Sequence, residues 1–87
     1  MKVLMKPIDM IAWFTKDGVP NPLKYRIQGE GKENITVSVE RIITREEEKL
    51  AGNRMFVFKC QSLIEGIEKP FELKYELNTC KWYLYKI

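Results

Sequence analysis

The chain has 87 residues, of which 45% are hydrophobic and 31% charged, so it is long enough for one folded domain and too short for two. This composition excludes a disordered chain, and no apolar run approaches the roughly 20 residues of a membrane-spanning helix. The formal net charge of +3 is smaller than the strongly basic balance expected of a dedicated nucleic-acid-binding protein.

The amino-terminal residues and the cysteines indicate where the protein resides. Residues 1–7 include lysines, but their apolar run is much shorter than the roughly 7–15 residues of a secretory signal, so we expect a cytoplasmic protein. Two cysteines, Cys60 and Cys80, do not make a disulfide framework. We expect both to be free thiols in a reducing compartment.

Six apolar runs follow one another along the chain, separated by clusters of proline, glycine and asparagine. Within each run, hydrophobic and polar residues alternate with a period of two, which is typical of β-strands. The runs cover residues 8–15, 23–27, 35–43, 56–60, 71–77 and 80–85.

Short connections between these runs favour antiparallel neighbours. The sequence therefore predicts one all-β domain over residues 1–87, a six-stranded antiparallel meander that forms a small barrel or a strongly curved sheet. The predicted core consists of Ile8, Met10, Phe14, Tyr25, Ile27, Val37, Val39, Phe56, Phe58, Phe71, Leu73, Tyr75, Trp82 and Leu84.

The third run changes phase within its length. A strict alternation cannot bury both Val39 and Ile42, so we expect a β-bulge near Glu40 and Arg41 that bends the strand. Residues 44–50 follow as the end of this strand and a hairpin. One helical turn is the alternative there, because a threonine followed three residues later by a glutamate resembles a capping box.

The sequence offers little for catalysis. It contains no histidine, which removes the commonest general base and the commonest metal ligand. Glycines at positions 29 and 31 match no phosphate-binding loop and indicate a hairpin turn, and most carboxylates alternate with apolar residues on a solvated face. We therefore expect no enzyme, no metal and no cofactor.

Cys60 and Cys80 both fall on the inner phase of their strands. In a six-stranded meander they lie two strands apart, about 9–10 Å, which is too far for a disulfide. We expect small buried side chains. A reactive thiol is the alternative, supported by Lys81 beside Cys80.

Aromatic and basic side chains share the outer phase of the predicted sheet. We take them as a candidate binding surface, which consists of Trp13, Lys24, Arg26, Lys81, Tyr83 and Tyr85. Such residues form cross-strand pairs that only stabilise a sheet, anchors of a protein interface, or a platform for single-stranded nucleic acid. The modest charge favours a protein-interaction module or a weak homodimer, with a nucleic-acid-binding barrel as the alternative. We expect no membrane partner.

The last run is apolar or aromatic on both phases. An exposed terminal strand normally carries polar or charged protection, so we expect the strand to pair with the first strand and close the barrel, with its outer phase under residues 1–5. A two-fold interface or docking on a different protein are the alternatives.

Three features together carry a family resemblance: the D-G-x-P-x-P turn at residues 17–22, the long bent strand, and the F-E-L-x-Y and W-x-L patterns at residues 71–75 and 82–84. In these features the chain resembles small bacterial proteins of unknown function. The resemblance implies a bacterial all-β protein and carries no activity.

Overall fold

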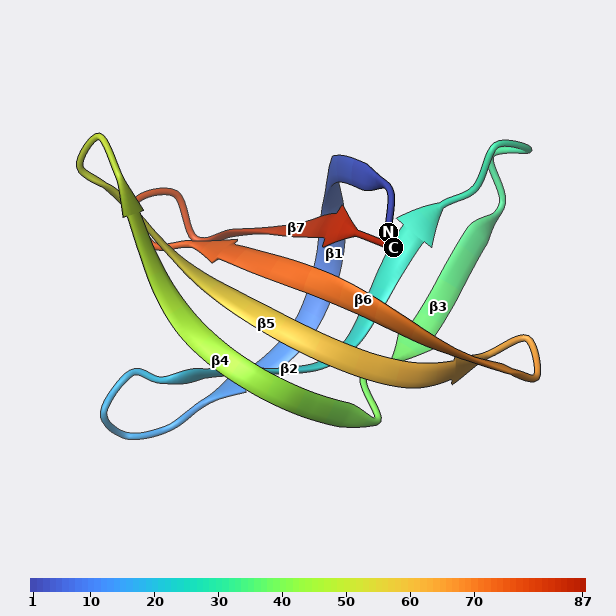
Figure 1. Ribbon diagram of the computed structural model, residues 1–87, viewed down its shortest axis with the longest axis horizontal. Coiled ribbons are helices and arrows are strands. Elements are labelled where there is room, and N and C mark those ends of the chain that lie inside the picture. The colour runs from blue at the N-terminus through green and yellow to red at the C-terminus, as the bar shows by residue number, and fades with distance from the viewer.

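The structure is a computed structural model that describes residues 1–87, and it confirms the all-β antiparallel class. The strands form a single antiparallel sheet in the order β3-β2-β1-β7-β6-β5-β4, which curls into a half-barrel (Figure 1). The seven strands are β1 (Val3–Phe14), β2 (Pro20–Gln28), β3 (Asn34–Ser38), β4 (Arg41–Leu50), β5 (Asn53–Ile64), β6 (Ile67–Glu76) and β7 (Lys81–Lys86). The chain has no helix that could cross a membrane.

The structure has seven strands rather than six because the predicted third strand is divided at Val39 and Glu40. Before this point β3 pairs with β2, and after it β4 pairs with β5. The segment is thus one bent strand that changes its partner halfway along. The predicted phase break is correct, but the bulge itself lies between Ile42 and Thr44. The 44–50 stretch is strand, so the helical alternative is wrong.

The first and last strands are neighbours in the centre of the sheet. β1 pairs with β7, with Ile8 opposite Trp82, so the predicted pairing is correct. The sheet does not close into a full barrel, because β3 and β4 remain its two edges. Beyond the strands, Lys2 and Ile87 exchange two backbone hydrogen bonds of 2.7 and 3.1 Å. The two termini therefore lie side by side (Figure 1).

Two tight hairpin turns set the register of β4, β5 and β6. In the turns Ala51-Gly52 and Glu65-Gly66, both residues have a positive φ, between 50° and 83°. Paired left-handed residues are the signature of the two-residue type I′ turn, whose twist matches that of antiparallel strands, and glycine adopts this conformation at little cost.

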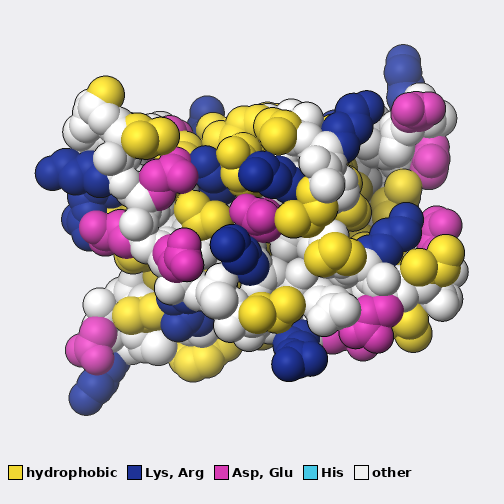
Figure 2. Space-filling model, viewed as in Figure 1, with side chains coloured by type: hydrophobic (Ala, Val, Ile, Leu, Met, Phe, Trp, Pro, Cys, Tyr) yellow, Lys and Arg dark blue, Asp and Glu magenta, His cyan; other side chains and the backbone are white.

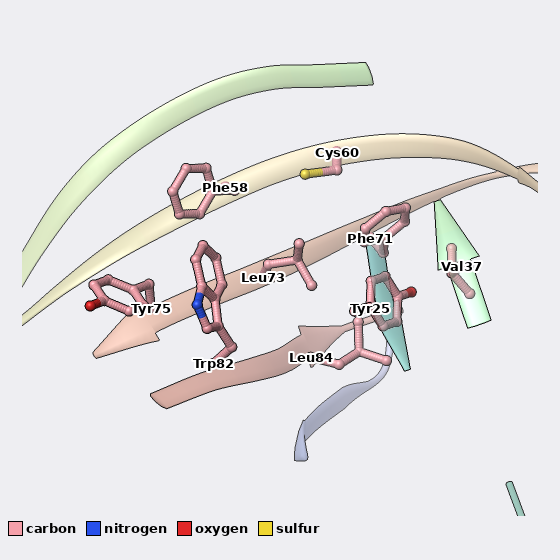
Figure 3. Packing of buried hydrophobic residues seen from close by; sticks show 9 residues of the cluster. All are labelled: Tyr25, Val37, Phe58, Cys60, Phe71, Leu73, Tyr75, Trp82 and Leu84. Carbon is pink, nitrogen blue, oxygen red and sulfur yellow. The ribbon is translucent and has the colours of Figure 1, made fainter. Parts of the chain in front are cut away.

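The core fills the concave side of the sheet (Figure 3). The ring of Trp82 lies between those of Tyr75 and Phe58, with centroid distances of 4.8 and 5.5 Å, and Tyr25 packs on Phe71 at 5.6 Å. Aromatic pairs at such distances stabilise a core beyond the area that they bury. The buried cluster consists of Tyr25, Val37, Phe58, Cys60, Phe71, Leu73, Tyr75, Trp82 and Leu84.

Some predicted core residues are less buried than expected. Ile8, Met10, Ile27, Val39 and Phe56 pack at the margin of the cluster and are partly buried. The side chain of Phe14 is 49% exposed, so its assignment to the core was wrong. Phe14 ends β1 beyond the segment that pairs with β7, and its ring meets that of Tyr75 edge-on at a centroid distance of 5.9 Å.

The prediction for the two cysteines is half correct. Both are free, and Cys60 is buried, but Cys80 is exposed. Cys80 does not belong to a strand: it closes the β6–β7 turn with a φ of 60°, and its N–H donates to the carbonyl of Glu76 at 2.8 Å. The left-handed conformation turns its side chain away from the alternation of β7.

Candidate functional site

The candidate binding surface divides into two groups on either side of β1. Trp13 on β1 and Lys24 and Arg26 on β2 form the first group, here called the hairpin group. Lys81, Tyr83 and Tyr85 on β7 form the second, here called the β7 group. Tyr83 is opposite Pro7, six residues before Trp13 along β1. Six residues of strand span about 20 Å, so one compact site does not include both ends.

Within the β7 group, Lys81 is exposed and the two tyrosines are partly buried, and other side chains cover the ring of Tyr85. The ammonium group of Lys74 lies 3.9 Å from the centroid of the Tyr85 ring, and that of Lys86 lies 4.9 Å from it. Lys74 itself is buried and forms an ion pair of 2.9 Å with Glu48. Two cations over one ring stabilise it in place, and they occupy the ring face on which a base would stack.

The charges near the β7 group alternate across the strands. Lys81 is opposite Glu76, and Glu72 lies between Lys59 and Lys86 in register. Figure 2 shows one face of the molecule, on which basic, acidic and hydrophobic side chains are intermixed. Glu72 is buried and is an exception to the expectation that most carboxylates lie on a solvated face. Opposite charges side by side stabilise a sheet and leave little field to attract phosphates.

The hairpin group lies within an exposed apolar patch. Ile11, Trp13 and Leu23 are 63%, 52% and 45% exposed, respectively. Ile11 and Trp13 point outward from β1 two residues apart, and Leu23 is the extra residue of a bulge in β2 beside them. We call Ile11, Trp13, Leu23 and Lys24 the hairpin face.

A shallow hollow of about 340 Å³ adjoins the hairpin face, and its lining includes Ile11, Lys24 and Arg26. Arg26 donates two hydrogen bonds to Asp9, of 2.9 and 3.2 Å, and its charge is therefore compensated. Lys24 is opposite Ile11 on one side and Ser38 on the other, so neither register partner carries a charge. The hollow has an apolar wall and one cation without a carboxylate beside it in register.

Sequence reasoning missed two members of the hairpin face. Ile11 shares the outer phase of Trp13, so the same alternation could have found it. In the run over residues 23–27, a strict period of two places Leu23 on the inward phase of Tyr25 and Ile27. Leu23 is the extra residue between Pro22 and Lys24, and this bulge shifts the register and leaves the Leu23 side chain in solvent. No local sequence pattern predicts such a bulge.

The surroundings of the Cys60 thiol and the Tyr75 hydroxyl raise their pKa values. Burial raises the pKa of Cys60 to about 12, with a further contribution from Glu72. The hydrogen bond between Tyr75 and Cys80, together with burial, raises the pKa of the Tyr75 hydroxyl to about 12. No three histidine, cysteine or carboxylate side chains lie close enough together to hold a metal ion.

Comparison of the chain with protein-family models, with curated proteins and with solved structures gives no match. The hairpin face is therefore the main structural indication of function.

Proposed function

We propose that the protein is a small non-enzymatic binding module that docks on another protein chain through the hairpin face. The observation that carries the proposal is the joint exposure of Ile11, Trp13 and Leu23 on one β-hairpin. Contiguous exposed hydrophobic side chains cost solvation free energy and mark interaction surfaces. Tryptophan is also among the residues that contribute most to protein interfaces.

The charges around the hairpin face support a protein partner. Arg26 is held by Asp9 at 2.9 Å, so Lys24 is the remaining basic residue of the hairpin group. A protein interface has an apolar centre with charge at its rim, which matches three hydrophobic side chains beside one lysine.

Binding of single-stranded nucleic acid is the second candidate. An exposed tryptophan beside Lys24 could stack a base and pair with a phosphate. This candidate requires further cations around the ring, and affinity that falls steeply with salt. The ion pair of Arg26 with Asp9 weighs against it.

Site-specific photo-crosslinking in cells tests the proposal and separates the two candidates. The photoreactive residue p-benzoylphenylalanine replaces Trp13 in one variant. In a matched control it replaces Leu50, which is 64% exposed at the far end of β4. We expect a discrete crosslinked protein band from position 13 and none from position 50. Introducing Ile11→Lys into the position-13 variant should abolish that band.

Three results would contradict the proposal. Equal crosslinking from both positions means that the hairpin face is not a specific surface. A band that nuclease removes identifies nucleic acid as the partner. A band that persists with Ile11→Lys shows that the apolar patch does not carry the binding. Light scattering of the purified chain then shows whether the partner is a second copy.

A further inference from the structure

The outer edge of β3 lacks a backbone partner. The N–H of Val39 donates to the carbonyl of Leu23 at 2.8 Å, and the N–H of Gly29 donates to that of Glu33, so the odd-numbered residues of β3 bond to β2. In an antiparallel ladder, alternate residues direct their backbone groups to opposite sides. The backbone groups of Asn34, Thr36 and Ser38 therefore face the open side, where only the Ser38 carbonyl finds a partner, the hydroxyl of Ser62.

The two edge strands differ in how they are protected. β4 has the sequence RIITREEEKL and contains a bulge, and charged side chains with bulges are the usual devices that prevent an edge from pairing. β3 has the sequence NITVS and contains no charged residue and no proline, and its pairing with β2 shows no bulge. β3 is thus an unprotected edge in a chain that protects its other edge.

A groove runs along the open edge of β3. It has a volume of about 370 Å³, with Ile35 and Val37 on one wall and Leu63 and Ile64 on the other. The opposite wall is the tip of the β5–β6 hairpin, which extends beyond the end of β3 (Figure 1). Within this tip, Leu63 and Ile67 are each 59% exposed, although hairpin tips are usually polar.

We propose that the β3 groove binds an extended peptide segment of another protein by β-strand addition. Backbone groups on an open edge recognise an extended chain, and pockets for alternate side chains select its sequence. The two charged residues that line the groove are Glu40 and Glu65, which favour lysine or arginine beside the apolar residues of the peptide. The hairpin tip bounds the groove opposite β3, so one extended chain fits where the sheet of a second copy does not.

The test uses a labelled six-residue peptide, acetyl-Lys-Val-Lys-Val-Lys-Val-amide, and fluorescence anisotropy with the whole chain. The comparison peptide has the same sequence with an N-methyl group on every residue, which removes the backbone donors from both edges of the strand. We expect the unmodified peptide to bind at least tenfold more tightly. Equal affinity for the two peptides overturns the proposal, because strand addition requires those donors.

Two protein variants locate the binding site. Thr36→Pro removes an N–H that faces the open edge and should weaken binding at least tenfold, whereas Thr36→Val should change it less than twofold. Because proline could disturb β3, Glu65→Lys provides an independent test at an exposed turn position. It should weaken binding of the lysine peptide several-fold and favour a glutamate–valine counterpart. Unchanged affinities in Glu65→Lys overturn the proposal.

The test of peptide binding at β3 is independent of the test of protein binding at the hairpin face. Trp13→Ala should leave peptide binding at β3 unchanged, since Trp13 does not line this groove. A dimer in light scattering that Thr36→Pro dissociates identifies a second copy as the occupant of the edge, which also overturns the proposal of a peptide partner.

Discussion

The hydroxyl of Ser62 donates a 2.7 Å hydrogen bond to the backbone carbonyl of Ser38. The same hydroxyl accepts a 3.0 Å hydrogen bond from the N–H of Glu40. One buried side chain on β5 thus satisfies backbone groups on both sides of the point where the bent strand leaves β2 and joins β5. At this point, where the chain passes from β3 to β4, the Ser62 side chain supplies the hydrogen bonds that a neighbouring strand would otherwise supply.

The first prediction concerns this junction. Ser62→Ala leaves a partly buried carbonyl and a backbone N–H without their partners, so it should lower the free energy of unfolding by about 1–3 kcal/mol. Urea denaturation followed by tryptophan fluorescence measures the change. Ser38→Ala is the matched control: it keeps the carbonyl and removes only an exposed side chain, so the loss should stay within about 0.5 kcal/mol. Equal stabilities of the two variants contradict this role of Ser62.

The second prediction separates the two thiols. Cys80 is exposed, whereas Cys60 is buried and its pKa is raised to about 12. The thiolate is the reactive form, so a disulfide reagent at pH 8 should modify one thiol per chain quickly and the second only after denaturation. Cys80→Ser should abolish the fast phase. A fast phase that persists in Cys80→Ser shows that the pocket around Cys60 opens readily.

The third prediction concerns alkaline pH. Burial raises the pKa of Tyr25 and of Cys60 to about 12, above the ordinary values of about 10 and 8.5. Between pH 9 and 12 the unfolded chain loses these protons while the folded chain keeps them, so stability should fall as pH rises. Urea midpoints measured across this range provide the test. Cys60→Ala should show a shallower decline, and an identical slope argues that Cys60 ionises equally in both states.

The fourth prediction concerns the buried cation on the outer face. Lys74 contacts the Tyr85 ring and the Glu48 carboxylate. Lys74→Met keeps most of the apolar stem and removes the charge, so it should lower the free energy of unfolding by about 1–2 kcal/mol. Lys69→Met, at an exposed position on the same strand and opposite Ser62, is the control and should change little. A Lys74→Met variant more stable than the natural chain shows that desolvation of the ammonium outweighs both contacts.

The sequence by itself determined the strands and the inward side of most of them. Phe58, Leu73 and Trp82 were assigned to the core from alternation alone, and they are buried. This succeeds because the side-chain period of a strand is two, so a run of residues reports its own two faces without reference to any partner. The phase change between Val39 and Ile42 likewise revealed the bend before any pairing was known.

Only the tertiary structure decided what lies above each face and which edges pair. Phe14 shares the alternation of the core but ends beyond its neighbours, and Lys74 and Glu72 alternate outward yet are buried. A period of two defines a side of the strand but not what covers that side. Whether an edge is open depends on partners that are distant in sequence. The edge of β3 is unpaired because the bent strand changes its partner from β2 to β5, and no local pattern predicts that change.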